Sequence, residues 1–239
     1  MYGSYNSPFK LEYAEFTLSV ENYDGFYLYK RELLGLEDNV EKIINKQIYS
    51  LLINPIEPVN LPKKLTPLLL IEFAKSIIIG PYSIKKVYIK YPVEIGVFIS
   101  DDINNYDILD FFILARKKYT VYGNPSNGSL CRYWSSDVYL SLPETNPLYE
   151  GILELNITNT TGRWVEVTQT VLNAYGMKIY HNNIIVSMKA SMRVTSQNMA
   201  ETEFINQPIQ EGMVKATELY TISKVQFVSG TKYVMENGI

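Results

Sequence analysis

Short runs in which polar and apolar residues alternate cover most of the chain, and they predict β-strands. Residues 15–20 (EFTLSV) place Phe16, Leu18 and Val20 on one face. Asp24-Gly25 separates this run from residues 26–33 (FYLYKREL), and an Asp-Gly pair between two β-rich runs predicts a hairpin. Further β-rich runs predict strands within residues 46–55, 86–100, 110–117, 118–123, 151–158, 163–172, 177–182, 183–196 and 223–236.

Three stretches are less regular. Residues 67–76 (PLLLIEFAKS) fit a short helix or a buried strand, and the three consecutive isoleucines Ile77–Ile79 favour strand at the end of this stretch. Pro92 interrupts a strand-like run, so we expect an edge, a bulge or a corner there. Residues 207–221 are the best helix candidate, although Gly212 weakens it. The helix would carry an apolar stripe formed by Ile209, Met213, Ala216 and Tyr220.

Many short strands with little helix predict an all-β fold of the β-sandwich or jelly-roll type, with one peripheral helix. Residues 142–151 are rich in Pro and Asn and resemble a link. We therefore expect two β-rich halves, residues 1–141 and 152–239. The alternative is one continuous domain built from two sheets.

Residues 119–140 (YTVYGNPSNGSLCRYWSSDVYL) predict a hairpin whose loop is centred on Asn124–Gly128. Pro125 fixes its own φ near −65°, and Asn127-Gly128 can adopt positive φ, which would let the chain reverse. Alternation along the second strand predicts Cys131 and Tyr133 on an apolar face. Arg132 and Trp134 would then lie on the opposite face.

The same hairpin contains residue types that are common at interaction sites: the planar cation of Arg132, the aromatic ring of Trp134 and the carboxylate of Asp137. Trp164 follows a turn next to Arg163; if exposed it would extend a binding surface, and if buried it is core. We expect core, because Trp164 begins a strand with Val165 and Val167. The candidate binding surface consists of Tyr122, Asn124, Arg132, Trp134, Asp137 and Arg163.

The chain has one cysteine and one histidine, which excludes an internal disulfide, a Cys-based zinc site and a multi-histidine metal site. A nucleophilic Cys131 would need a base, and the single histidine, His181, falls in what looks like a turn tip. We expect a buried structural thiol. No phosphate loop or dinucleotide fingerprint is present, and we expect no catalytic residue, metal or cofactor.

The acidic residues have ordinary explanations in the sequence. Asp101, Asp102, Asp107 and Asp110 loosely resemble a calcium loop but lack its central Gly and terminal Glu, so we expect a solvated acidic loop. Four glutamates fall on predicted strands, where alternation would turn them outward: Glu15, Glu94, Glu154 and Glu166. A glycosidase needs two carboxylates that face each other, which the sequence does not show.

Charge and hydropathy narrow the class of partner. The net charge of −3 and the pI near 5.4 disfavour a protein that binds nucleic acid mainly through phosphates. The N-terminus lacks the pattern of a secretory signal, and the longest apolar runs are too short or too charged to span a bilayer. We expect a soluble, cytoplasmic protein.

Four phrases together resemble a family of uncharacterised archaeal proteins known as a domain of unknown function: MYGSYNSPFKLEY, YTVYGNPSNGSLCRYWSSDVY, WVEVTQTVLNAYGMKIYH and ASMRVTS. The resemblance extends over most of the chain. It implies an archaeal, intracellular protein and brings no activity or site residue.

Three functions stay open at this point. The first is a non-enzymatic binding or assembly module whose partner is a protein, either itself or another, which requires an exposed aromatic or hydrophobic patch. The second is a β-sandwich that binds a small ligand or a carbohydrate in a concave pocket lined by tyrosines or Trp134. The third is a carboxylate-dependent hydrolase, which requires a cleft with paired titratable groups.

Overall fold

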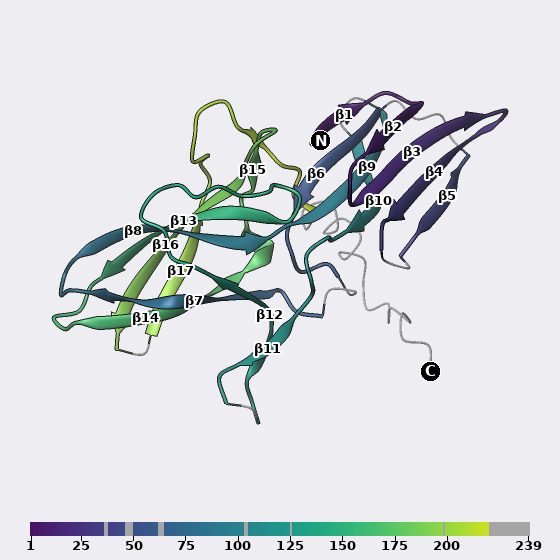
Figure 1. Cartoon of the computed structure of the whole chain (residues 1–239). Helices are drawn as coiled ribbons and strands as arrows, with labels where there is room; N and C mark the ends of the chain where they lie inside the picture. The colour runs from purple at the N-terminus through teal and green to yellow at the C-terminus, as the bar shows by residue number, and fades with distance from the viewer. Residues whose placement is uncertain are drawn as a thin grey trace.

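The computed structural model describes residues 1–219 except 36–37, 46–49, 62–64, 103–104, 125 and 198. These residues form eighteen β-strands and one short 3₁₀-helix, Ala174–Gly176. The all-β prediction is therefore confirmed. Two lobes make up the molecule, with two sheets in each (Figure 1).

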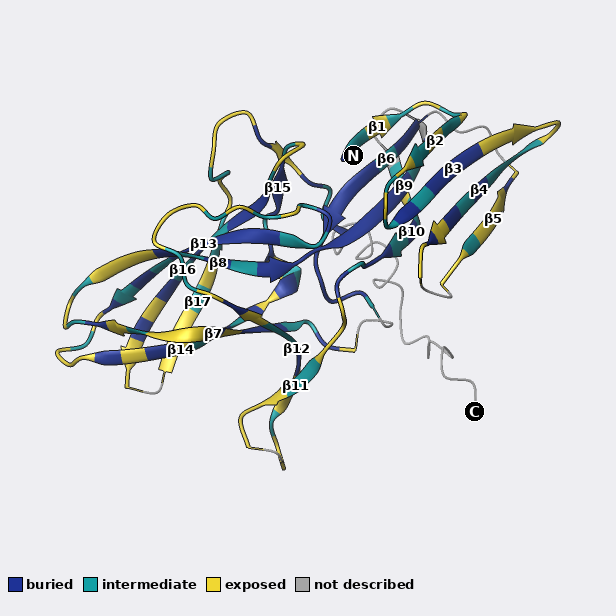
Figure 2. Cartoon of the chain, in the orientation of Figure 1, coloured by how far each residue is buried: buried dark blue, intermediate teal, exposed yellow. Residues whose placement is uncertain are grey.

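The first lobe, the AB lobe, contains sheets A and B. Sheet A has the order β1 (Gly3–Tyr5), β6 (Ser50–Ile56), β9 (Glu94–Asp102), β10 (Asn105–Phe112). Sheet B has the order β2 (Phe9–Glu12), β3 (Phe16–Tyr23), β4 (Phe26–Leu33), β5 (Val40–Ile44). The predicted hairpin joins β3 to β4, with Tyr23 opposite Phe26. The inner faces of both sheets supply buried residues such as Phe16, Ile53 and Val97 (Figure 2).

The second lobe, the CD lobe, is a sandwich of sheets C and D. Sheet C has the order β11 (Tyr119–Tyr122), β12 (Ser129–Ser136), β7 (Leu68–Ile79), β14 (Val165–Asn173). Sheet D has the order β18 (Val214–Lys215), β15 (Tyr180–His181), β16 (Val186–Ser196), β13 (Glu150–Asn159), β8 (Ile84–Pro92), and β17 (Met199–Ile205) also pairs with β16. Apolar residues of the two facing sheets, such as Ile71 and Leu155, are fully buried between them.

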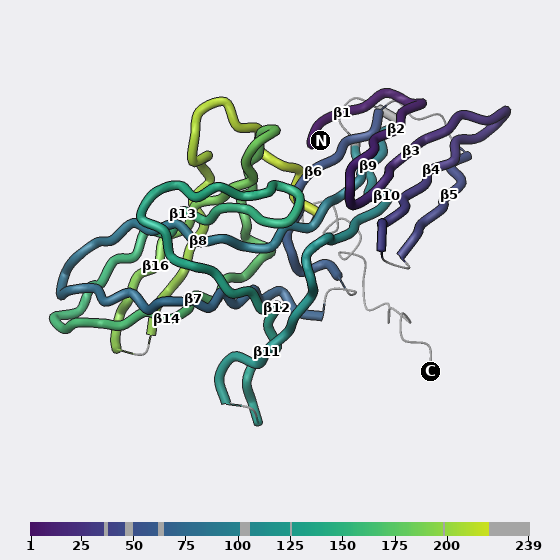
Figure 3. The backbone as a smooth tube through the Cα atoms, viewed as in Figure 1, coloured from purple at the N-terminus to yellow at the C-terminus, as the bar shows by residue number. Residues whose placement is uncertain are grey.

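The chain crosses from one lobe to the other at Pro92. Strand β8 ends there in sheet D, and β9 begins two residues later in sheet A (Figure 3). Because proline has no N–H to donate to a ladder, it is well suited to the change of sheet, and the corner predicted at Pro92 is confirmed. One hydrophobic cluster contains residues of all four sheets, so the lobes share a core.

Strands from both sides of residues 142–151 pair with each other. Strand β13 pairs with β8, and β14 pairs with β7. Sheets C and D therefore join the two predicted halves, residues 1–141 and 152–239. The two lobes do not correspond to these halves. The division at residues 142–151 stays a prediction about folding units.

Of the two stretches for which a helix was considered, the first is a strand and the second is not a helix. Residues 67–76 belong to strand: β7 runs for twelve residues to Ile79. The peripheral helix over residues 207–221 is wrong for the described part, 207–219, because strand β18 and turns occupy most of it. Gly212 explains the failure, since its φ of +79° lies in the left-handed region and interrupts a right-handed helix. The strand run predicted within 223–236 lies outside the described residues.

The hairpin predicted for residues 119–140 is confirmed. Strands β11 and β12 pair antiparallel with Tyr122 opposite Ser129, and the backbone oxygen of Asn124 accepts hydrogen bonds from the N–H groups of Asn127 and Gly128. The positive φ is not at Asn127 or Gly128, as expected, but at Gly123, with a φ of +92°. Pro125 lies outside the described residues.

Candidate functional site

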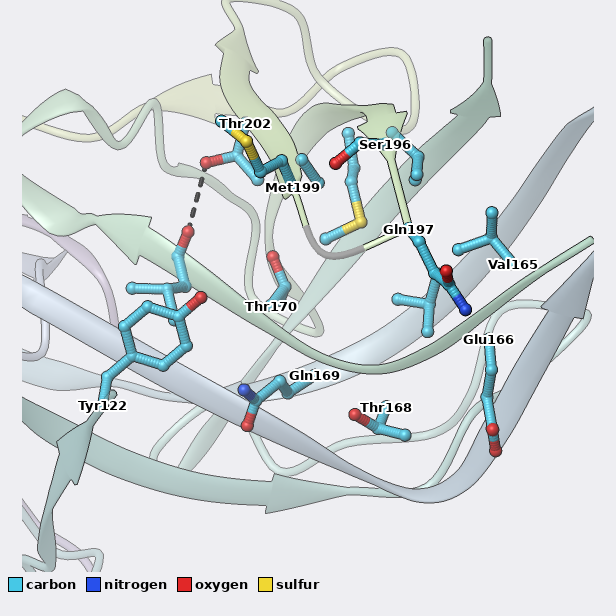
Figure 4. Close-up of a pocket in the computed structure, with 15 residues that line it drawn as sticks. Tyr122, Val165, Glu166, Thr168, Gln169, Thr170, Ser196, Gln197, Met199 and Thr202 are labelled. Carbon is cyan, nitrogen blue, oxygen red and sulfur yellow. Dashed lines mark hydrogen bonds between the residues drawn. The ribbon is translucent and has the colours of Figure 1, made fainter. Parts of the chain in front are cut away.

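The CD sandwich has an open seam where two strand edges face each other. In sheet C, β14 pairs on one side only, with β7, and in sheet D, β17 pairs with β16. The hydroxyl of Thr202 on β17 donates to the backbone oxygen of Val171 on β14 over 3.1 Å, which ties the two edges together at one end (Figure 4). Away from this contact the edges flank a groove.

The seam groove has a volume of about 370 Å³. That lies in the range of pockets that bind small molecules, about 300–1,000 Å³. The apolar part of its lining comes from Val165, Val167, Val171, Met192, Val194, Met199 and Ala200. The polar part comes from Tyr122, Glu166, Thr168, Gln169, Thr170, Ser196, Gln197 and Thr202. Hydroxyl and amide groups therefore dominate the polar surface, with one aromatic ring and one carboxylate.

A break in the pairing between β7 and β14 creates much of this polar surface. The register against β7 shifts between Val167 and Gln169, so Thr168 has no opposite residue. Four residues of β7, Phe73 to Ser76, stand against this single residue, and beyond the break the buried positions of β14 change from odd to even numbers. Thr170 becomes buried as a result, and its hydroxyl has no hydrogen-bond partner among the described residues.

The groove continues into a second hollow at the end of the sandwich. Arg163 lines this hollow together with Thr161 and Gly162. Val165, Ser196 and Gln197 line both cavities. The exposed guanidinium of Arg163 therefore lies beyond one end of the seam groove.

The structure brings two of the six candidate binding residues to this site. Tyr122, at the end of β11, lines the seam groove, and Arg163 lines the adjoining hollow. Asn124 is exposed in the hairpin turn, where its side-chain oxygen accepts from the N–H of Ser126 over 3.0 Å. Asp137 is exposed just after β12. Neither Asn124 nor Asp137 lines the groove.

The other two candidates, Arg132 and Trp134, do not form an exposed surface. Arg132 is fully buried, and Trp134 packs partly buried against the main core. The adjacent residues Cys131 and Arg132 are both fully buried, so β12 is covered on both faces at this point. Arg132 and Trp134, which were predicted to face out, lie against the core, whereas Cys131 is buried as predicted and the hydroxyl of Tyr133 reaches the exposed carboxylate of Glu72. The reason is that β12 packs against sheet D, where the hydroxyl of Ser136 accepts from the N–H of Lys90 over 2.8 Å.

Arg132 forms part of a buried polar cluster between the lobes. Its guanidinium lies over the ring of Tyr119 at 5.4 Å, and its three nitrogens have no hydrogen-bond partner among the described residues. The fully buried carboxylate of Glu94 accepts from the N–H groups of Asn60 and Leu61 over 3.1 and 3.4 Å. Burial raises the pKa of Glu94 to about 8, although the two N–H groups and Arg132 oppose the shift.

Glu94 therefore corrects the expectation that strand glutamates point outward. Glu154 is also buried, and its carboxylate lies 3.8 Å from the ammonium group of Lys189. Asp110 contradicts the solvated acidic loop, because it lies in β10 and is buried against Arg31. Asp107 is exposed, and the side chains of Asp101 and Asp102 lie outside the described residues.

Cys131 and His181 do not form a catalytic pair. Cys131 is fully buried, and burial raises the pKa of its thiol, which disfavours the nucleophilic thiolate. His181 is not at a turn tip but in strand β15, buried, with Nε2 3.1 Å from the side-chain oxygen of Asn54. Burial lowers the pKa of His181 to about 4, so the imidazole is neutral at pH 7.

Trp164 overturns the prediction that it belongs to the core. The strand begins one residue later, at Val165, so Val165 and Val167 point inward. The indole of Trp164 is 70% exposed and lies over Gly80. The exposed Trp164 therefore adds an aromatic ring next to Arg163 in the candidate binding surface.

Sequence reasoning missed most of the groove residues. The alternation of 163–172 breaks at Thr168-Gln169-Thr170, where three polar residues stand in a row. That break in the alternation is the signal for the change of register against β7. The facing residues of β17 carry no comparable signal, since their position depends on the pairing with β16.

The described residues also bear on metal sites and on membrane-spanning helices. They contain no group of three or more His, Cys, Asp or Glu side chains placed to hold a metal ion. Within the same residues, no helix has the length and apolar character needed to cross a membrane.

Comparison with known proteins places the chain in a family. The family model described as "Protein of unknown function (DUF432)" matches residues 1–236. The chain belongs to this family. No curated protein and no solved structure matches the chain. The family has no assigned activity, and the archaeal origin implied by the sequence resemblance stays a prediction.

Proposed function

We propose that this DUF432 protein is a non-enzymatic binding module whose seam groove holds a neutral carbohydrate. One observation carries the proposal: hydroxyl and amide side chains from two facing strand edges line one groove, with the ring of Tyr122 at one end (Figure 4). Hydroxyls and amides both donate and accept hydrogen bonds, which matches the hydroxyl groups of a sugar. Of the three functions that the sequence leaves open, the groove therefore favours the small-ligand one. We keep the cytoplasm as the proposed location, on the sequence expectation alone.

The aromatic ring supplies the apolar part of recognition. Tyr122 is 44% exposed and labelled at the rim of the groove in Figure 4. A tyrosine ring offers a flat apolar face for the C–H groups of a sugar ring, while its hydroxyl remains free to bind polar groups. Gln169 and Gln197 come from the two sides of the groove, on β14 and after β16.

The acidic lining favours binding over hydrolysis. Glu166 is the one carboxylate among the described residues that line the seam groove. Glycoside hydrolysis by the common mechanisms needs two carboxylates about 5–9.5 Å apart. We therefore propose that Glu166 accepts hydrogen bonds from ligand hydroxyls and does no chemistry.

Isothermal titration calorimetry with named sugars tests the proposal. The probes are glucose, mannose, galactose, N-acetylglucosamine, maltose and cellobiose, with sodium sulfate as an anionic comparison. We expect at least one sugar to bind, and Tyr122→Ala to weaken it about tenfold, in line with the loss of a stacking contact. Gln197→Ala should weaken it about fivefold through one lost hydrogen bond.

A matched control is available for the aromatic variant. Tyr23 is also 44% exposed, on the hairpin at the far end of the AB lobe. Tyr23→Ala should leave the affinity unchanged. Equal losses for Tyr122→Ala and Tyr23→Ala, or no heat with any of the sugars, would contradict the proposal.

A second candidate, the protein-binding module, is favoured by a different observation. The β11–β12 hairpin projects from the body of the CD lobe (Figure 1), and it exposes Val121, Tyr122 and Leu130. Such an arm fits self-association through apolar contacts. Light scattering coupled to size-exclusion chromatography tests it: the double variant Val121→Asp, Leu130→Asp should convert an oligomer to a monomer. A monomeric wild-type protein across the accessible concentrations would remove this candidate.

A further inference from the structure

The end of the CD sandwich beyond the hollow is an exposed aromatic tip. Two turns meet there, the β7–β8 turn with Tyr82 and the β13–β14 turn with Trp164. Tyr82 is 77% exposed and Trp164 is 70% exposed. Each ring packs against a glycine of the other turn: the ring of Trp164 lies next to Gly80, and the ring of Tyr82 lies next to Gly162. We call these two turns the aromatic tip.

The aromatic tip is held rigidly although its rings are exposed. Asn159 is fully buried beneath it and donates its side-chain N–H groups to the backbone oxygens of Ile79, Gly80 and Arg163, over 2.7–3.2 Å. Its side-chain oxygen accepts from the N–H and the hydroxyl of Thr161. One buried side chain therefore fixes both turns, and their large apolar rings stay in water.

Backbone strain also marks this place. Tyr82 has a φ of +52°, and it is the only residue other than glycine with positive φ in the described part of the chain. A tyrosine in the left-handed region is unfavourable, and such strain tends to occur at functional positions. The N–H of Tyr82 donates to the backbone oxygen of Thr161 over 3.2 Å, which holds the strained turn in place.

Apolar and cationic side chains surround the two rings. Ile78 and Ile84 are exposed on β7 and β8, on the two sides of the tip. Lys85, Lys86 and Arg163 are exposed nearby. Among other charged residues near this end, Arg193 is paired with Glu201, and Glu166 lies opposite Ile78 in the β7–β14 ladder, so it offsets one of these three cations. The tip is therefore locally cationic in a chain whose net charge is −3.

We propose that the aromatic tip docks onto the surface of an anionic lipid bilayer. Tryptophan and tyrosine favour the membrane–water interface, where the ring meets acyl chains and the polar edge stays hydrated. Lysine and arginine at the same depth are attracted to anionic headgroups. Exposed aromatic rings flanked by cations match such a surface in both polarity and charge, which favours an anionic bilayer as the occupant. This inference goes beyond the proposed function and uses different rings.

Vesicle binding tests the proposal with an internal reporter. The chain has two tryptophans, and Trp134 can be removed by Trp134→Phe, which leaves Trp164 as the sole indole. The Nε1 of Trp134 has no hydrogen-bond partner among the described residues, so this change removes none. The probes are vesicles of phosphatidylcholine alone and vesicles with about 30% phosphatidylserine, since anionic lipid supplies the attractive surface potential. We expect the emission of Trp164 to shift to the blue with the anionic vesicles only.

Variants locate the contact. In co-sedimentation with the anionic vesicles, Trp164→Ala should weaken binding about tenfold or more, because a large apolar surface no longer leaves water. Ile184→Ala is the matched control: Ile184 is 72% exposed but lies before β16, at the opposite end of that strand from the tip. Arg163→Gln and Lys85→Gln should each weaken binding about fivefold, whereas Lys10→Gln in the AB lobe should not.

Three outcomes would overturn the proposal. The first is no binding to either kind of vesicle. The second is equal binding by wild type and Trp164→Ala while both melt at the same temperature. The third is the capture of a protein partner that depends on Trp164 in the absence of any vesicle binding, which would assign the tip to a protein instead. Tyr82→Gly removes the second ring without straining the backbone, because glycine adopts the positive φ of this position readily. It therefore separates loss of the ring from loss of the fold.

Discussion

Buried polar residues decide much of the behaviour of this molecule at the residue scale. Glu94 has a pKa raised to about 8 by burial, and His181 has a pKa lowered to about 4 by burial. Both residues lie between the lobes or sheets rather than in the seam groove. Their protonation therefore affects the stability of the fold. The sequence alone predicted an outward strand position for Glu94 and a turn for His181.

The two shifts predict opposite dependence of stability on pH. Glu94 is protonated in the folded state from an unfolded pKa near 4.3 up to about 8. Its contribution is complete below about pH 4 and is lost as pH rises toward 8. His181 stays neutral in the folded state below its unfolded pKa near 6.5. Its contribution is complete above about pH 6.5 and is lost as pH falls toward 4.

We therefore expect the free energy of unfolding to change little between about pH 4.5 and 6.5, and to fall between 6.5 and 8. Glu94→Gln should show rising stability over the first window and a flat second window. His181→Asn should show a continuous fall. Each slope is at most about 1.4 kcal/mol per pH unit. Urea unfolding at several pH values measures this, and identical slopes in all three proteins would show that neither group is shifted.

The single thiol gives a second prediction at this scale. Cys131 is fully buried but belongs to neither hydrophobic cluster, and its Sγ lies 3.6 Å from the backbone oxygen of Ser129. Cys131→Ala should lower the free energy of unfolding by about 1–3 kcal/mol, as for other small buried truncations. Sugar affinity should stay unchanged because Cys131 does not line the groove. Lost affinity with an unchanged melting temperature would show instead that the thiol is chemical.

At the scale of the element, a buried ion pair joins sheet B to sheet A. The Nε of Arg31 on β4 donates to the carboxylate of Asp110 on β10 over 2.7 Å, and the hydroxyl of Tyr29 donates to the same oxygen over 2.9 Å. The guanidinium also lies over the ring of Phe112 at 5.2 Å. Arg31 and Asp110 are both buried, and so are Tyr29 and Phe112 beside them, so the ion pair is shielded from water.

Removing one partner should be costly. Asp110→Ala leaves the buried guanidinium of Arg31 without its main counter-charge, and we expect a loss of about 3–5 kcal/mol in the free energy of unfolding. The exposed neighbour Asp107 supplies the control: Asp107→Ala should change stability by less than about 0.5 kcal/mol. Denaturant unfolding compares the two, and equal effects would mean that the ion pair contributes nothing to the joint.

Elements were predictable from the sequence where local chemistry determines them. Asp24-Gly25 and the 123–128 loop each specify a tight reversal between alternating strands, and both hairpins form. The helix over 207–221 failed because its apolar spacing also fits turns, which bury Met213 and Ala216. The prediction that Arg132 and Trp134 face outward failed, because alternation defines two faces of a strand but does not tell which of them is covered.

At the scale of the whole molecule, the site depends on pairing between distant segments. The seam exists because β14 ends sheet C and β17 ends sheet D on the same side of the sandwich (Figure 1). Tyr122 and Arg163, which line the groove and the adjoining hollow, could be chosen as candidate residues from their types and from the turns beside them. Gln169, Gln197 and Thr202 could not, because their convergence depends on the order of strands in two sheets, which no local pattern encodes.

Binding of a neutral sugar in the seam groove is tested most directly by chemical-shift mapping. Amide ¹H–¹⁵N spectra are recorded during titration with the tightest sugar of the calorimetric series, for wild type, Tyr122→Ala and Tyr23→Ala. We predict shifts that cluster on the residues of β14, β17 and the end of β11, strongly reduced in Tyr122→Ala and retained in Tyr23→Ala. Shifts that cluster elsewhere, or spectra unchanged by every sugar of the series, would show that the groove is not a sugar site.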